Sequence, residues 1–357
     1  MPVAGLVRLR KHQFGRQATF GNKVAATRAY PFTGVPENEL NWTDPEIDTG
    51  HRIIVAPPHR EAPELTASLD DPSLKYNDLP IMHAAFFGGE VVPSGGGTAK
   101  TWAFELASDE IGQPDAHTYE FGDDVTTDWF QLGDGILESV EITGPDGLGP
   151  LTASMSWRFG SIASSGSTDS PDAPTVPTAG LDVATDDAIV YLKDGLIRVA
   201  DTVAGLGAGQ INDALHTFVL RLSQEIDEKR WANGDQSFDI DAYAGGMVTI
   251  ELEATYAKTT QTVGIGSESD DWLSDQAVQR YIQMEFTSTV EAQGGTPFSW
   301  IFTMPARYYT REESDIGGNT VIVLMARANF DPDDFDGAFE STIVTTLTEA
   351  DLGLVAS

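Results

Sequence analysis

The stretch LTASMSWRF, residues 151–159, indicates the fold because apolar and polar residues alternate along its whole length. A period of two is typical of a β-strand with one covered face. The stretch VTIELEATY, residues 248–256, repeats the pattern. Shorter stretches such as TWAFELA, FVLRLS, YIQMEFTS and FSWIFTM follow the same rule. We therefore expect a mainly β, antiparallel protein, and the clearest helix candidate is DDWLSDQAVQRY, residues 270–281.

Composition narrows the classes of protein that need to be considered. The 357 residues suffice for one large β domain or two smaller ones. Without cysteine the chain has no disulfide and no thiolate metal site. No apolar run approaches the ~20 residues that span a bilayer, so we expect no membrane partner. The start of the chain lacks the apolar stretch of a cleaved secretory signal.

Charge is distributed unevenly along the chain. The net charge is −34, yet residues 1–36 contain basic residues and no acid. The acidic body would repel a nucleic-acid backbone, whereas a basic arm could lie on the acidic surface of another copy or stay solvated. Strong acidity is typical of proteins from a high-salt interior, and it also fits a surface that is negative for function.

The order of segments suggests four parts. Residues 1–50 read as an extended basic N-terminal arm, residues 51–160 as a first β-rich domain, and residues 181–357 as a second. Between the domains, residues 161–180 are rich in Ser, Pro and Gly and read as a linker or long loop. The strands within 139–159 and the strands within 218–256 look alike, which suggests a tandem duplication.

Motifs for chemistry are weak, so we expect no enzyme activity, no cofactor and no metal site. SGGGTAKT, residues 94–101, lacks glycines that a phosphate loop needs and reads as a hairpin loop. DPDDFDGAFE, residues 331–340, departs from calcium-loop spacing and reads as an acidic turn, with adventitious cation binding left open. The six histidines are dispersed and show no ligand spacing.

Several stretches in sequence order carry a family resemblance. They are FGRQATFGNKVAATRAYPFTGVPE (14–37), the region 132–161, the region 188–238, and FSWIFTMPARYYTREESDIGGNTVIVLMARANFD (298–331). Together they resemble the major tail tube proteins of long-tailed, siphovirus-like bacteriophages and related archaeal tailed viruses. Residues 40–95 find no place in the resemblance.

The resemblance implies a tail-tube-type antiparallel β-sandwich or barrel with a flanking helix. Such units join into a ring with a continuous inner β-barrel, and the rings stack head to tail into a hollow tube in the virion tail. Viral DNA would pass through without specific binding. Further partners would be the tail terminator, distal tail or baseplate proteins and, during assembly, the tape measure protein. If the fold is duplicated, a homotrimer with pseudo-sixfold symmetry is expected, and otherwise a homohexamer.

Two sets of residues are candidates for these roles. The polar sides of three stretches are candidates for the wall of a negatively charged lumen: Ser139, Glu141, Thr143, Thr152, Ser154, Ser156, Thr249, Glu251, Glu253 and Thr255. The same sides could instead face the outside of a tube, and Arg158 departs from the acidic pattern. The candidates for contacts between rings are Arg8, Arg10, Lys11, Arg16, Lys23 and Arg28.

One alternative belongs to a different functional class. A virion-surface or secreted β module that binds carbohydrate or a receptor could use tryptophan for stacking on sugars. However, Trp102, Trp157 and Trp300 stand in the apolar phase of their strands, which favours a place in the core.

Overall fold

The computed structural model describes residues 10–17, 20–39, 42–43, 59–60, 64–88, 92–106, 115–123, 128–146, 149–164, 188–211, 215–229, 242–258 and 278–352. Strands dominate these residues, and every pair of strands is antiparallel. The prediction of a mainly β, antiparallel protein is confirmed.

The described elements fall on either side of the gap at 165–187. The earlier elements are β1 (Arg10–Arg16), β2 (Arg28–Tyr30), β3 (Thr33–Glu39), β4 (Trp42–Thr43), β5 (His59–Arg60), β6 (Glu64–Asp71), α1 (Leu79–Phe87), β7 (Lys100–Leu106), β8 (His117–Asp123), β9 (Asp128–Gly144), β10 (Thr152–Phe159) and β11 (Ser161–Ser164). The later strands are β12 (Gly195–Ala200), β13 (Gln210–Ile211), β14 (Leu215–Lys229), β15 (Ala242–Ala257), β16 (Arg280–Gln293), β17 (Thr296–Ile316), β18 (Asn319–Ala328) and β19 (Phe339–Thr345). Short 3₁₀ helices cover Leu192–Asp194, Val203–Gly207 and Glu349–Leu352.

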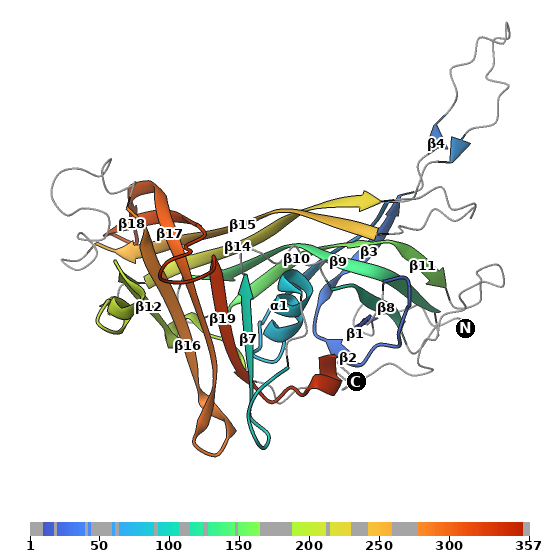
Figure 1. Ribbon diagram of the computed structural model, residues 1–357, viewed down its shortest axis with the longest axis horizontal. Coiled ribbons are helices and arrows are strands. Elements are labelled where there is room, and N and C mark those ends of the chain that lie inside the picture. The colour runs from blue at the N-terminus through green and yellow to red at the C-terminus, as the bar shows by residue number, and fades with distance from the viewer. Residues whose placement is uncertain are drawn as a thin grey trace, which may run out of the picture.

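Eight strands form one continuous row, which we call the long sheet. Their order is β3-β6-β10-β9-β14-β15-β18-β17, and each strand is antiparallel to its neighbours. The long sheet runs across the top of Figure 1, with β3 at its right-hand end and the β17–β18 hairpin at its left-hand end. Strands from both halves of the sequence therefore share one sheet, because β9 pairs directly with β14.

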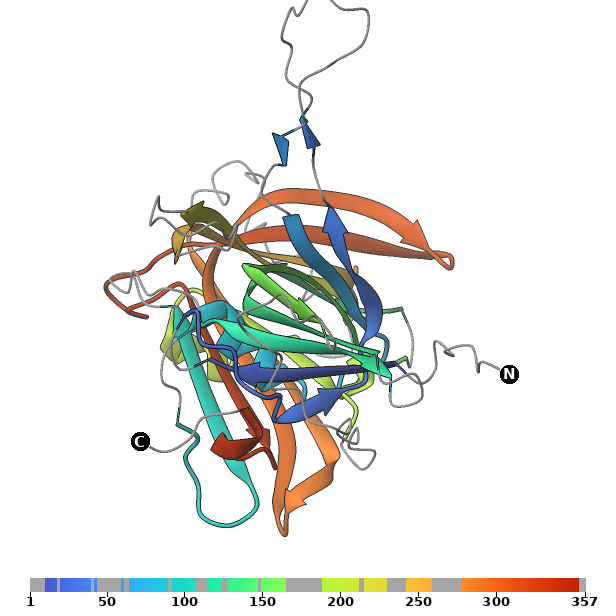
Figure 2. The same cartoon turned by 90° about the vertical axis from the view of Figure 1, so that its right-hand side faces the viewer.

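The two longest strands of their regions, β9 and β17, each leave the long sheet and continue into a second layer. The first part of β9 pairs with β8 and β11, and β8 also pairs with β1. The first part of β17 pairs with β16 and β19, and β16 also pairs with β12. Figure 2 shows β1 and β2 in a layer below β3 and β6. Strand β7 pairs with β19 at the edge of the other layer.

Aromatic side chains fill the space between the layers. Phe14 of β1 packs on Trp157 of β10 with 4.9 Å between ring centroids, and on Tyr119 of β8 at 4.7 Å. Near the other end, Trp300 of β17 stacks on Phe286 of β16 at 5.3 Å. One continuous core holds all five residues, so the layers are tied together by apolar burial along the described chain.

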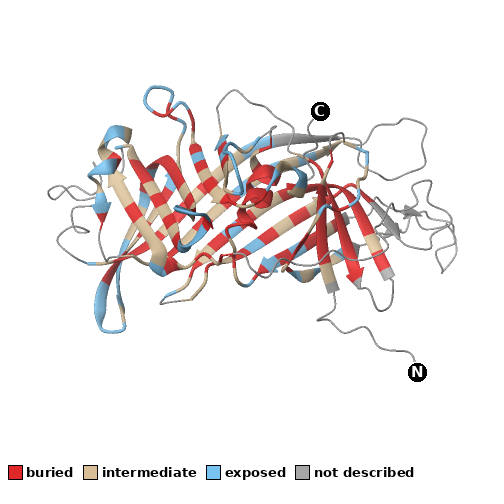
Figure 3. Cartoon of the chain, turned by 90° about the horizontal axis from the view of Figure 1, so that it is seen from below, coloured by how far each residue is buried: buried red, intermediate tan, exposed pale blue. Residues whose placement is uncertain are grey.

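Helix α1 lies under the long sheet and is buried on almost every side (Figures 1 and 3). Its sequence, LPIMHAAFF, is apolar throughout, which is typical of a helix enclosed by protein. Pro80 in its first turn fits the start of a helix, and Gly88, at φ 69°, donates its amide to the Ala84 carbonyl at the end.

Three expectations change with the structure. Residues 10–39 are not an extended arm, because β1 pairs on both edges and Phe14 is buried in the core. The expected linker begins later than 161, since 161–164 form β11, and the rest of it lies outside the described residues. The expected helix at 270–281 lies outside them through residue 277, and its final residues, 280 and 281, belong to β16.

Two buried histidines predict how stability depends on pH. Burial lowers the pKa of His83 and of His117 from 6.5 to about 4, so the folded protein keeps both rings neutral. Nδ1 of His83 lies 2.9 Å from the Leu79 carbonyl, and its Nε2 has no hydrogen-bond partner among the described residues. The unfolded chain binds protons below about pH 6.5, whereas the folded chain does not, so stability falls as pH falls.

We expect the free energy of unfolding to fall by about 2 kcal/mol per histidine between pH 7 and pH 5. Denaturant titrations of the parent and of His83→Gln at both pH values measure this loss. Burial raises the pKa of Asp71 and of Glu120, which acts in the opposite direction, but equally in both proteins. The loss should therefore be smaller in the variant, and an equal loss in both proteins would contradict the assignment.

Candidate functional site

One face of the long sheet is polar across its strands, and we call it the polar face. It contains all the residues predicted for a lumen wall. They lie on three strands: Ser139, Glu141 and Thr143 on β9, Thr152, Ser154 and Ser156 on β10, and Thr249, Glu251, Glu253 and Thr255 on β15. Strand β14 lies between β9 and β15. Paired residues point to the same side of a sheet, and their neighbours along each strand, such as Ile142 and Leu252, are buried in the core.

The residues of the polar face differ in exposure. Glu141 and Ser154 are exposed, whereas Thr255 is only 5% exposed. A shallow groove of about 460 Å³ crosses the centre of the face. Its polar lining consists of Ser68, Asp70, Ser139, Glu141, Ser154, Ser156, Arg221, Ser223 and Glu251. The structure thus brings the predicted residues onto a single surface.

A row of charged side chains, with one serine among them, crosses the polar face from strand to strand. Register places Asp70, Ser154, Glu141, Arg221, Glu251 and Arg327 side by side. Ser154 Oγ donates to Asp70 Oδ1 at 2.6 Å, and Arg221 Nε donates to Glu141 Oε2 at 2.8 Å. Arg327 Nε donates to Glu251 Oε1 at 3.0 Å. Opposite charges on neighbouring strands stabilise the pairing of those strands.

Arg221 stands at the centre of this row between carboxylates of two strands. It also donates from a terminal nitrogen to Glu253 Oε2 at 3.2 Å. Partial burial lowers the pKa of Arg221, but its hydrogen bonds to Glu141 and Glu253 outweigh this and leave the pKa raised. The guanidinium is therefore a fixed positive charge whose donors already point at protein carboxylates.

A second arginine is held between two carboxylates near the end of β10. Arg158 Nε forms an ion pair with Glu138 Oε1 at 2.7 Å, and a terminal nitrogen donates to Glu228 Oε1 of β14 at 3.0 Å. Burial lowers the pKa of Arg158, and the bonds to Glu228 and Glu138 more than reverse that effect. The residue that departed from the acidic pattern is thus enclosed by acids, so the surface around it keeps a negative balance.

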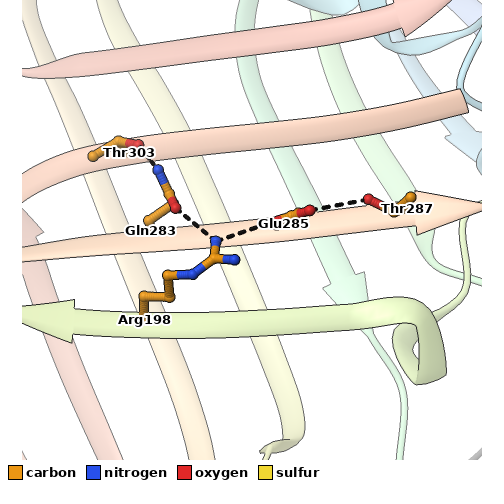
Figure 4. Close-up of polar contacts among 5 residues, drawn as sticks. All are labelled: Arg198, Gln283, Glu285, Thr287 and Thr303. Atoms are coloured by element: carbon orange, nitrogen blue, oxygen red, sulfur yellow. Dashed lines mark hydrogen bonds and ion pairs between the residues drawn. The ribbon is translucent and has the colours of Figure 1, made fainter. Parts of the chain in front are cut away.

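The layer that contains β16 carries a comparable network (Figure 4). Arg198 of β12 donates to Gln283 and to Glu285 of β16, both at 2.7 Å. Gln283 Nε2 donates to Thr303 Oγ1 of β17 at 3.1 Å, and Thr287 Oγ1 donates to Glu285 Oε1 at 3.2 Å. An arginine fixed by neighbouring acceptors is therefore a recurrent feature of the described sheet surfaces.

The candidates for contacts between rings lie mostly on the body. Arg16 pairs with Asp115 at 2.7 Å, and Arg28 approaches Asp78 at 3.9 Å. Both side chains are largely covered and engage acids of their own chain, because β1 and β2 belong to the folded layer. Lys11 and Lys23 are half-buried. Arg8 and the side chain of Arg10 lie outside the described residues.

In the acidic turn at 331–340, the first carboxylate accepts hydrogen bonds from groups of the same chain. Asp331 Oδ1 accepts the amide hydrogen of Asp333 at 3.1 Å, and Oδ2 accepts the hydroxyl of Tyr281. Among the residues that the structure describes, no group of three His, Cys, Asp or Glu side chains could hold a metal ion.

Reasoning from the sequence missed part of the polar face. Arg221 was visible in FVLRLS as the single charge on an alternating strand, and ELTASLDD, residues 64–71, alternates well enough to indicate β6 with Asp70. Arg327 lies in VIVLMARA, which carries little period-two signal.

No protein-family model and no curated protein matches the chain. No helix in the described part of the chain is long and apolar enough to cross a membrane.

Proposed function

We propose that this chain is a viral tail tube protein that assembles into rings, and that the stacked rings conduct DNA along the polar face. The observation that carries the proposal is the long sheet: eight antiparallel strands with one apolar face on the core and one polar, carboxylate-bearing face. A wall for an aqueous channel needs these two faces, and joining the sheet ends of several copies would close the ring.

We also infer that the fold is a tandem duplication. The strands that we match between the two units differ from those that the sequence suggested. In the long sheet the first four strands, β3-β6-β10-β9, have the chain order first, second, fourth, third. The last four strands, β14-β15-β18-β17, have the same order. Strands β9 and β17 then both enter the second layer, beside β8 and β11 or beside β16 and β19.

Local irregularities support this correspondence. The pairing of β9 with β10 shifts after Leu137, leaving Glu138 as an extra residue, and the pairing of β17 with β18 shifts after Tyr308, leaving Tyr309. The arginine across from each shift contacts the extra residue: Arg158 forms an ion pair with Glu138, and Arg327 lies over the Tyr309 ring.

A duplicated fold also bears on the stoichiometry of the ring. With two equivalent units per chain, a homotrimeric ring with pseudo-sixfold symmetry is the assembly that we favour over a homohexamer.

The polar face suits passage of a polyanion because its positive charges are already engaged. Arg221 and Arg327 are bound by Glu141, Glu253 and Glu251, so few donors remain for phosphate. Phosphate contacts supply most of the affinity for DNA, and without them DNA stays mobile.

We place the protein in the virion tail tube. Its other proposed partners are the tail terminator, distal tail or baseplate proteins and the tape measure protein. In this role the acidity would serve the lumen, solubility in a salt-loving host, or both.

The second candidate, a module that binds carbohydrate or a receptor, has less support. The four tryptophans with described side chains, Trp102, Trp129, Trp157 and Trp300, are all buried. None of these indole faces is therefore available for stacking on a sugar.

Negative-stain microscopy of the purified protein from low to molar salt tests the proposal. We expect rings or stacked tubes with a central bore in at least one condition. Single particles in every condition would contradict it, and particles that remain single but bind a glycan array would favour the second candidate.

A further inference from the structure

We propose that β17 of one copy pairs with β3 of a second copy in the register that β9 uses with β14 inside the chain. This inference rests on the proposed function and goes further by naming the strands, the register and the charges of the contact. It makes the internal junction, β9 with β14, the template for an external junction between copies.

The two ends of the long sheet are open edges among the described residues. Within the part of the chain that the structure describes, β3 pairs only with β6. Strand β17 pairs with β16 as far as Ala306, and beyond Ala306 its only described partner is β18. An open edge offers unpaired amide and carbonyl groups, and a strand of a second copy is one way to satisfy them. The open lengths, 33–39 and 307–316, are long enough for such pairing.

Strand direction also fits the external junction. All neighbours in the long sheet are antiparallel, and the row has eight strands, so β3 and β17 run in opposite directions across the sheet. When copies are related by rotation about a ring axis, β17 of one copy meets β3 of the next as an antiparallel neighbour. The alternation of directions then continues around the ring.

The register of the external junction follows from the two shifts. Arg158 and Arg327 are equivalent. In the first unit, Arg158 is opposite Thr66, and Thr66 is opposite Glu37. In the second unit, Arg327 is opposite Glu251, and Glu251 is opposite Arg221, so Glu37 is equivalent to Arg221. The shifts after Leu137 and after Tyr308 are also equivalent. Glu141 follows Leu137 by the same number of residues as Glu312 follows Tyr308, so Glu312 is equivalent to Glu141.

Inside the chain Arg221 is opposite Glu141, and Val219 is opposite Thr143. The external junction therefore places Glu37 opposite Glu312. By the same count, it places Val35 opposite Ser314.

The external junction thus differs from the internal one in charge. Arg221 and Glu141 attract one another at 2.8 Å, whereas Glu37 and Glu312 would repel one another. Both glutamates are exposed, and neither forms an ion pair within the described residues. Pro36, at the position of Leu220, has no amide hydrogen and makes the external junction the weaker of the two. Salt that screens the two carboxylates should therefore favour association of the copies.

Charge exchange tests the electrostatic part. Glu37→Arg recreates the internal pair, so we expect rings at low salt, where the parent is mostly single. Glu312→Arg should act likewise, and the double variant should again need salt. Light scattering and sedimentation across a salt series measure this. Equal salt dependence in the parent, both single variants and the double variant would overturn the charge assignment.

Disulfide trapping tests the register directly, because the chain contains no cysteine of its own. With Val35→Cys and Ser314→Cys together, mild oxidation should produce covalently linked copies. The matched control, Val219→Cys with Thr143→Cys, pairs within one chain and should give no linked copies. Rings that form without a link between positions 35 and 314 would overturn the junction and leave the proposed function standing. Single particles throughout would contradict both.

Discussion

Replacing Glu141, Glu251 and Glu253 together by glutamine is expected to turn an assembly that does not retain duplex DNA into one that does. These carboxylates accept the hydrogen bonds of Arg221 and Arg327. Without their negative charge, the two guanidinium groups become available to phosphate. For each freed arginine that contacts a phosphate, raising the salt from 50 to 200 mM should weaken DNA binding about threefold. This salt dependence identifies the binding as electrostatic.

Filter binding of labelled duplex DNA to assembled protein, over a salt series, measures this effect. The matched control is Asp333→Asn, Asp334→Asn and Asp336→Asn, which removes the same charge from an exposed turn of the described chain. We expect the control to bind as little DNA as the parent. Equal binding by both variants would show that total charge, and not release of the arginines, governs retention.

The second large effect is on folding. Trp157→Ala should lower the free energy of unfolding by about 3–5 kcal/mol, because it leaves a cavity where two layers meet. The indole is fully buried, 4.9 Å from the Phe14 ring and 5.7 Å from the His117 ring between centroids. Chemical denaturation followed by fluorescence measures the change.

A control for this effect is Val290→Ala, a truncation at an exposed position in the β16–β17 hairpin. We expect it to change stability by no more than about 0.5 kcal/mol. If Trp157→Ala cost equally little, the two layers would not depend on this contact for their packing.

The alternation of apolar and polar residues was enough to predict strands with one face on the core and one face on solvent. β10 and most of β15 keep the period of two, and the structure buries the apolar set of each. β3 was missed because Gly34, Pro36 and Glu37 remove the apolar signal from its sequence, TGVPENE. The strand forms because β6 pairs with it. Such a contact between distant segments leaves no signal in the local sequence.

The polar face could be predicted residue by residue but not as a connected row. Glu141 and Glu251 were identified from their own strands, yet β14 lies between those strands and places Arg221 between the two carboxylates. Long-range pairing decides which strands are neighbours, and the sequence pattern within one strand does not encode it. The charge pairs therefore became visible only with the sheet order.

The duplication expected from the sequence stays a proposal, and the strand order supports a different match of strands from the one that the sequence suggested. Strands β9 and β10 were compared with β14 and β15, whereas strand order matches them with β17 and β18. In the correspondence that we propose, Trp157 would be equivalent to Ala326, and such a difference in side-chain volume would hide the relation from a comparison of the sequences. Cores tolerate many changes of apolar side chain without a change of fold.

A density map of the assembled protein, at a resolution that separates strands, tests the central claim most directly. The account predicts a ring whose bore is lined by the polar face, with Glu141, Arg221 and Glu251 facing the axis and β17 of each copy beside β3 of the next. A map in which these three side chains face the outer surface, or in which the bore is lined by another sheet, would contradict it.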